Sequence, residues 1–184
     1  MSLRFGILGL LKYESMTGYD LQKTFNSSLQ FMWNAKTSQI YRELKTLESQ
    51  QLVSSSVIEQ ESKFDRKVYT ITTKGNKAFL SWMQKFPQDL NAPIRDEFIM
   101  RIFFSEFIDD DEVSFEIRRY QKQQEDLLQI LYVIQKQAQL DAKENGHERS
   151  LFYWLLSIKR AMKSIEAEKE WAKESLALIE CRKG

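Results

Sequence analysis

The stretch from Thr37 to Glu48 constrains the fold most, because one of its faces is apolar and the others are polar without being acidic. Ile40, Leu44 and Leu47 recur at intervals of four and three, the spacing of an amphipathic helix. We therefore expect a helix over about 38–50 that packs by this face. The other faces carry hydroxyl, amide, phenol and cationic groups, which bond phosphate oxygens and base edges. These candidate DNA contacts are Ser38, Gln39, Tyr41, Arg42 and Lys45.

A predicted β-hairpin follows this helix. Residues 52–58 and 68–71 have the composition of strands, and the polar segment 61–67 lies between them. Lys63, Arg66 and Lys67 make this tip cationic. Such a tip usually contacts phosphate or the minor groove when it lies beside a DNA-recognition helix, here the helix over about 38–50, which we call the reading helix. Glu61 and Asp65 dilute the charge, so a solvated turn is the alternative. Helix, hairpin and tip together predict a winged helix-turn-helix.

The remaining N-terminal segments fit the same fold. Residues 3–12 form an apolar helix, and Thr17, with Asp20 three residues later, has the pattern of a helix N-cap. Leu21 and Phe25 mark the core face of this second helix. Thr72 or Thr73 is expected to cap a fourth helix. The apolar stripe of that helix consists of Phe79, Trp82, Met83 and Phe86.

Pro87 and Pro93 mark the predicted domain boundary, with a winged-helix domain at 1–87 and a helical dimerisation domain at 94–184. Helices are expected over about 94–107, 110–143 and 148–180, so the fold class is mainly α. The second of these has a heptad seam with one polar member, Gln124, which we interpret as a register-setting residue. The seam comprises Val113, Ile117, Tyr120, Gln124, Leu127, Leu131, Ile134 and Ala138. By helical phase, Trp171 lies off the apolar face of the last helix.

Charge and cysteine content agree with a DNA-binding protein of a reducing compartment. Residues 1–75 hold ten Lys and Arg against seven Asp and Glu, whereas residues 76–184 hold seventeen against nineteen. The modest basic excess therefore lies with the predicted reading helix. Cys181 is the only cysteine of the sequence, so no intrachain disulfide forms. No segment is long and apolar enough to cross a bilayer, and we expect a cytoplasmic protein.

Three motifs in this order and spacing resemble the PadR family of transcriptional regulators. They are Thr17-Gly-Tyr-Asp-Leu21, Gln39-Ile-Tyr-Arg-Glu-Leu44 and the segment from Lys67 to Gly75. The helical remainder is similar to the C-terminal domain of the virulence-activator branch, which includes AphA. The resemblance covers nearly the whole chain. It implies a homodimer whose two winged helices bind successive major grooves of an inverted repeat, more often as a repressor than as an activator.

The resemblance also assigns roles to individual residues. Tyr19 and Tyr41 match tyrosines that bond the DNA backbone, and Thr17 belongs to the same motif; the alternative is that the two phenols only seal the core. A small aromatic or phenolic effector is implied as well, with Trp33 and Trp154 as candidate contacts. For both tryptophans, packing within the core or the dimer is the simpler interpretation.

Other classes of function find little support in the sequence. His147 and Cys181 are single and far apart, so we expect no metal site and no cofactor. No phosphate-binding glycine loop and no nucleophile with a base is visible, so an enzyme is not expected. The main alternative to a DNA-binding regulator is a winged-helix module that binds another protein.

Overall fold

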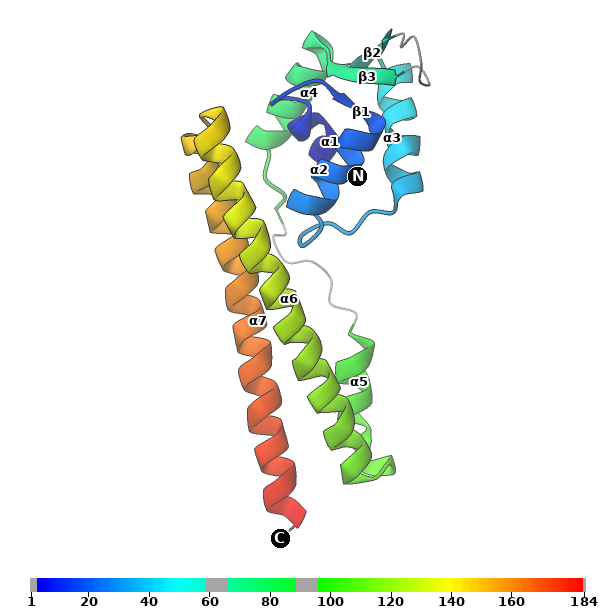
Figure 1. Ribbon diagram of the computed structural model, residues 1–184. Helices are drawn as coiled ribbons and strands as arrows, with labels where there is room; N and C mark the ends of the chain where they lie inside the picture. Colours follow the sequence, from blue (N-terminus) through cyan, green and yellow to red (C-terminus); the bar gives the residue numbers. More distant parts are fainter. Residues whose placement is uncertain (1–2, 59–65, 89–95, 184) are drawn as a thin grey trace. The chain divides into compact units, whose positions relative to one another are not determined.

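Residues 3–58, 66–88 and 96–183 are described by the computed structural model, and they belong to two units, residues 1–91 and 92–184. The first unit contains four helices and a small sheet (Figure 1). Its elements are α1 (Leu3–Leu10), β1 (Met16–Thr17), α2 (Gly18–Ser28), α3 (Thr37–Ser49), β2 (Val53–Ile58), β3 (Arg66–Ile71) and α4 (Thr73–Gln84). This order of elements confirms the predicted winged helix-turn-helix.

The sheet is antiparallel, with the strand order β1-β3-β2. The hairpin pairs Val53 with Ile71 and Ile58 with Arg66, so the second strand begins two residues before the predicted Val68. β1 was not predicted. It pairs Met16 with Tyr69 and thereby joins the start of α2 to the wing.

The core of the first unit lies between α1, α2, α3 and the sheet. Ile40, Leu44 and Leu47 are fully buried, which confirms the predicted inner face of the reading helix. Burial of large aliphatic side chains is the main stabilising contribution to such a core. The other largest buried side chains are Ile7, Leu8, Leu21, Phe25 and Val53.

Two predicted helix caps are present. The Thr17 hydroxyl accepts a hydrogen bond from the Asp20 N–H at 3.1 Å, and that of Thr72 accepts one from the Gly75 N–H at 3.0 Å. Each satisfies a backbone donor that the first turn of a helix leaves free. At α3 the Gln39 side chain instead accepts the Lys36 N–H at 2.8 Å.

Several aromatic side chains of the first unit lie nearer the surface than predicted. Trp33 is 41% exposed in the segment before α3, so it is not a core residue. α4 ends at Gln84, which places Phe86 beyond the helix and 80% exposed. Trp82 stacks on Phe5 of α1 with 4.7 Å between ring centroids, yet remains 40% exposed. The predicted stripe of α4 is therefore only partly covered within its own unit.

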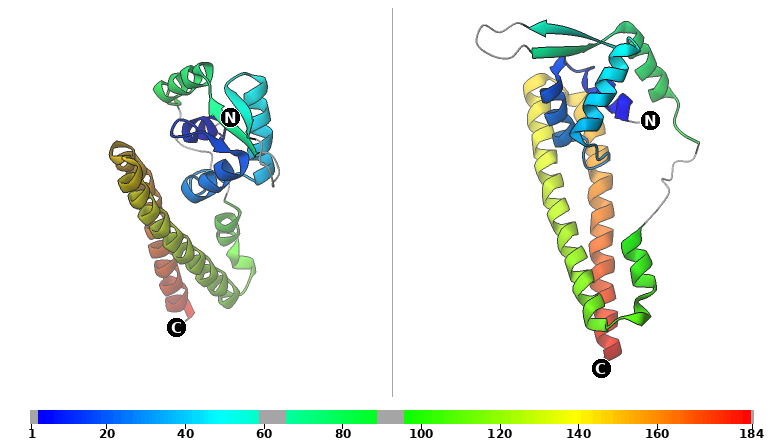
Figure 2. Two further views of the ribbon diagram at one scale, coloured as in Figure 1. Left: turned by 45° about the horizontal axis from the view of Figure 1, so that its top comes forward. Right: turned by 90° about the vertical axis from the view of Figure 1, so that its right-hand side faces the viewer.

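The second unit is helical. Two helices of 36 residues each, α6 (Asp110–Asn145) and α7 (Glu148–Lys183), run antiparallel along each other (Figure 2). α5 (Glu97–Phe103) and the short η1 (Ser105–Phe107) precede them. The predicted helix at 94–107 is thus shorter and ends in a 3₁₀ turn; residues 94 and 95 lie outside the described residues.

Two details of the second unit correct the predicted helix faces. Leu128 is 8% exposed whereas Leu127 is 47% exposed, so the inner position moves by one residue past Gln124. A straight α-helix drifts from a strict seven-residue repeat by about 20° per heptad, which accounts for the shift. Trp171 packs edge-on against Phe98 and Tyr120, at centroid distances of 6.2 and 5.9 Å, so it belongs to the packed face.

Candidate nucleic-acid interface

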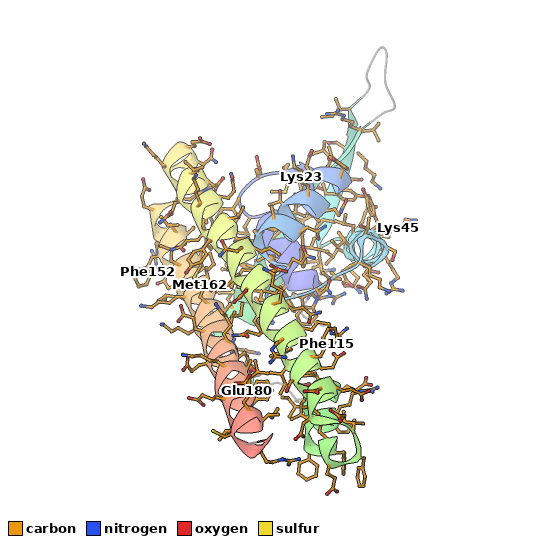
Figure 3. The ribbon with its side chains drawn as sticks, turned by 60° about the horizontal axis from the view of Figure 1, so that its bottom comes forward. Lys23, Lys45, Phe115, Phe152, Met162 and Glu180 are labelled. Carbon is orange, nitrogen blue, oxygen red and sulfur yellow. The ribbon has the colours of Figure 1, made fainter. Side chains whose placement is uncertain are left out.

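The outer face of α3 is open to solvent. Ser38, Gln39, Arg42 and Lys45 are all exposed, as the periodicity predicted. Figure 3 shows Lys45 on the side of α3 that faces away from α1 and α2. The opposite side is held by packing and by an ion pair between Arg4 of α1 and Glu43 at 3.1 Å. α3 therefore presents amide and cationic groups from a fixed support.

A hollow of about 380 Å³ adjoins α3. Its wall is formed by the start of α2, by Tyr41 of α3 and by the first residues of β3. Three tyrosines and two cations thus converge from segments far apart in the sequence. The lining residues are Thr17, Gly18, Tyr19, Asp20, Tyr41, Arg66, Lys67 and Tyr69.

Tyr19 and Tyr41, the two exposed tyrosines of this hollow, are placed differently. Tyr19, in the first turn of α2, is 66% exposed, and Tyr41 is 39% exposed. The Tyr41 ring lies directly against Gly18, where an added Cβ would stand 2.7 Å from its Cε1. Glycine at this position lets the ring lie flat on the helix start. Both hydroxyl groups are placed where they can bond an oxyanion.

The start of α2 adds a favourable field for an anion. The first N–H groups of a helix carry partial positive charge, and backbone donors at such a terminus bind phosphate. The Thr17 hydroxyl also donates to Asp20 Oδ2 at 2.7 Å, so it is engaged within the cap. Asp20 supplies the one carboxylate among the lining residues. Thr17 therefore shapes this wall, and the exposed side chains of Tyr19, Tyr41 and Arg66 can approach a ligand.

Lys67 forms the best-defined contact at the wing. Its Nζ lies 2.8 Å from Glu48 Oε2 and 5.3 Å from the centre of the Tyr69 ring. Glu48 Oε1 also accepts a hydrogen bond from the Ser55 hydroxyl. The hydrogen bond with Lys67 lowers the pKa of Glu48 and raises that of Lys67, so both groups are charged at neutral pH. Arg66 is exposed beside this pair, and Lys63 lies outside the described residues.

The two tryptophans proposed as effector contacts belong to different units. Trp33 is in the segment between α2 and α3 of the first unit. Trp154 is in the first part of α7, partly buried, with its ring 5.9 Å from that of His147 in an edge-to-face arrangement. Neither belongs to the lining of the hollow.

Sequence reasoning missed three participants of this site. Gly18 stands in a motif that was noted, yet its contact with Tyr41 bridges two helices. Tyr69 was predicted only as a strand residue. Side chains two residues apart in a strand lie on the same face, which would have placed Tyr69 beside Lys67. Glu48 lies on the polar side of α3. A carboxylate among cationic groups was the signal that could have identified it.

The described parts of the chain contain neither a metal-ligand cluster nor a membrane-spanning helix. No group of three or more His, Cys, Asp or Glu side chains there is arranged to hold a metal ion. Among those same residues, no helix is both long and apolar enough to span a bilayer.

Family models match almost the whole chain. Residues 7–81 match the transcriptional regulator PadR-like family, and residues 94–180 match the virulence activator alpha C-terminal domain. The chain is 26% identical over 178 residues to the negative transcriptional regulator PadR of Bacillus subtilis (strain 168), covering 97% of each protein.

Solved structures show the same likeness. The crystal structure of B. subtilis PadR in complex with operator DNA has a TM-score of 0.82 at 27% identity, covering 97% of this chain and 99% of that one. The complex of the same protein with p-coumaric acid has a TM-score of 0.76 at 26% identity, covering 98% and 99%. The virulence activator AphA of Vibrio cholerae has a TM-score of 0.75 at 25% identity over 98% and 99%. The chain therefore consists of a domain of the PadR-like family of transcriptional regulators followed by a virulence activator alpha C-terminal domain.

Proposed function

We propose that the protein is a homodimeric repressor that binds an inverted-repeat operator through α3, the hollow and the wing. The observation that carries this function is the convergence of Tyr19, Tyr41 and Lys67 on one hollow beside the exposed face of α3. Phosphate contacts from such a hollow fix the protein on the duplex, and side chains of the helix then read base edges. The likeness to PadR bound to its operator supports the same orientation.

Within this function, the residues have different tasks. Arg42 can bond guanine and Gln39 can bond adenine, each bidentate pair discriminating by about 1–3 kcal/mol. Ser38 and Lys45 complete the groove face, while Thr17 shapes the phosphate site. The wing cations Lys63, Arg66 and Lys67 contact the backbone or the adjacent minor groove. They supply the sequence-independent part of the affinity.

The test of this interface is a pair of substitutions on α3. We expect Arg42→Ala and Lys45→Ala each to weaken binding to a duplex from the region upstream of the gene, with unchanged thermal melting. Lys77→Ala, a cation removed from the exposed side of α4, is the charge-matched control and should bind normally. Loss of a residue that contacts base edges changes the relative affinities for duplex variants, whereas loss of a phosphate contact lowers all affinities alike. Normal binding by both α3 variants would exclude this helix from the interface.

Replacing Lys63, Arg66 and Lys67 together with alanine tests the wing. Because fewer counterions are released, the salt dependence of binding should become flatter. The same titration tests the alternative of a protein-binding module, since duplex binding weakens steeply with salt. An unchanged salt slope in the triple variant would show that the wing does not reach the backbone.

The homodimer is supported by apolar side chains that a single copy leaves exposed. Phe115 of α6 is 64% exposed and Phe152 of α7 is 60% exposed, and both project from the helices in Figure 3. Leu127, Val133 and Tyr153 are likewise at least 47% exposed. A second copy would cover such surface and hold two reading helices about 34–36 Å apart, one turn of duplex.

Sedimentation tests this assembly. The full chain should sediment as a dimer at micromolar concentration, whereas residues 1–88 should form a folded monomer that binds the operator far more weakly. A monomer of the full chain at that concentration would exclude the dimer.

Relief of repression by a small phenolic acid completes the proposed function. B. subtilis PadR has been crystallised with p-coumaric acid, and Trp33 and Trp154 are the candidate contacts in this chain. Titration with p-coumaric acid should quench tryptophan fluorescence and release the duplex, and Trp154→Phe should reduce the quenching. A regulator of this kind works in the cytoplasm with the DNA and requires no catalytic activity. An unchanged duplex affinity at saturating p-coumaric acid would exclude this effector.

A further inference from the structure

Glu48 joins the reading helix to both strands of the wing. It lies in the last turn of α3, where Oε2 accepts from the Lys67 Nζ of β3 at 2.8 Å and Oε1 accepts from the Ser55 hydroxyl of β2. The Tyr69 ring lies on another side of the Lys67 ammonium. A carboxylate thus holds a wing cation at the edge of the surface that faces DNA.

This arrangement contributes little to folding. The side chains of Lys67 and Glu48 are 45% and 31% exposed, and ion pairs open to solvent to this extent stabilise a protein only slightly. Stability alone therefore does not account for an acidic group at this place. Its effect on ligand binding is larger, because Lys67 lines the hollow proposed to take a phosphate.

The pair changes the charge that the hollow offers to DNA. Sequence-independent affinity grows with the number of phosphates that cations neutralise, and each adds about 0.9 to the slope of log K against log salt. A lysine already paired with a carboxylate releases fewer counterions on binding. The Glu48–Lys67 pair therefore lowers attraction to any duplex and leaves the base contacts of α3 unchanged.

We infer that Glu48 restrains the sequence-independent part of DNA affinity by holding Lys67 in a neutral pair. This role rests on the proposed function, because it requires the hollow to face the DNA backbone. Glu48 acts through Lys67 and touches no base itself, so it is a positioning residue.

Glu48→Gln tests the role with a side chain of the same shape. The amide keeps an acceptor for the Ser55 hydroxyl but carries no charge, which frees Lys67. Affinity for a 30-base-pair duplex of random sequence, measured by fluorescence anisotropy across a salt series, should rise, and the log-log slope should steepen by about 0.9. Affinity for a duplex selected from a random pool should rise by the same factor, because a phosphate contact is common to all sequences.

Two further variants assign this effect to the pair. Glu43→Gln makes the same change of charge on the same helix but frees Arg4 of α1, which does not line the hollow. Its salt slope should equal that of the wild type. Glu48→Gln combined with Lys67→Met removes both charges and should return the slope to the wild-type value.

The outcomes separate this role from the proposed function. If the wild type binds neither duplex, the proposed function itself fails. If the wild type binds and Glu48→Gln shows an unchanged slope, the restraint is absent although the DNA-binding function stands. If Glu48→Gln melts normally but binds DNA more weakly and with a flatter salt slope, Glu48 instead orients Lys67 toward the phosphate. This result also overturns the restraint.

Discussion

Gly18→Ala tests whether the packing of Tyr41 prepares the phosphate site. The added Cβ would stand 2.7 Å from Tyr41 Cε1, 3.3 Å from Cζ and 3.4 Å from the hydroxyl oxygen. Carbon atoms in good contact are about 3.5–4.0 Å apart, so the ring must move by about 1 Å. Gly18 does not have a left-handed backbone, and alanine is therefore compatible with its conformation.

The expected effect on folding is small. The Tyr41 ring is 39% exposed and can swing toward solvent. Alanine in place of glycine in a helix gains about 0.5–1 kcal/mol, which offsets much of the 1–3 kcal/mol that overpacking costs in a closed core. We therefore expect the free energy of unfolding to change by at most about 1 kcal/mol.

The expected effect on DNA binding is larger. A phenol that bonds a phosphate makes a hydrogen bond to a charged group, worth about 1.5–3 kcal/mol. Displacing the ring should therefore weaken operator binding by about ten- to 150-fold. Fluorescence anisotropy gives the affinity, and thermal melting gives the stability of the same sample.

A second background makes this prediction decisive. In a Tyr41→Ala chain the added Cβ meets no ring, so Gly18→Ala should have no further effect on affinity. An equal loss in both backgrounds would show that the substitution acts by another route. Wild-type affinity in the single variant would mean that the position of the Tyr41 ring does not matter for binding.

The remaining predictions concern backbone strain and pH. Gln51 has a left-handed φ of 59°, so Gln51→Gly should raise the free energy of unfolding by about 1 kcal/mol in urea titrations; a decrease would contradict this. Gly75→Ala places a Cβ 2.0 Å from the Leu52 carbonyl oxygen and should lower the free energy by about 3 kcal/mol, and an unchanged midpoint would refute that clash. Burial and the nearby Glu168 charge raise the pKa of Tyr120 from 10.0 to about 12. Because the folded pKa is the higher one, this stabilisation is present below pH 10 and is lost as pH rises toward 12. Tyr120→Phe should flatten the decline of stability over that window, and an identical decline would exclude the assignment.

Local patterns were sufficient to predict the helices and the wing hairpin of the fold. Ile40, Leu44 and Leu47 define the inner face of α3, since a helix repeats its faces every 3.6 residues. The caps at Thr17 and Thr72 were visible because each acts on a backbone group three residues away. The polar groups of the reading surface, Arg42 and Lys45 included, followed from the same helical phase.

The site itself depends on contacts between distant residues. Glu48 meets Lys67 across 19 positions, and Gly18 meets Tyr41 across two helices, so neither contact has a period in the sequence. β1 is two residues long and is stabilised by pairing with β3, too short for any alternation to show.

The seam of the second unit shows the same division in one helix. Periodicity predicted that α6 has an inner face, and residues near its start occupy it as expected. Which of Leu127 and Leu128 is buried depended on how α6 packs along α7, because a real helix gradually departs from a seven-residue repeat. The sequence determined the helices, their caps and their polar faces, since these arise within a few residues. Only the tertiary structure decided the hollow, the Glu48–Lys67 pair and the burial of Leu128, because each requires the meeting of separate elements.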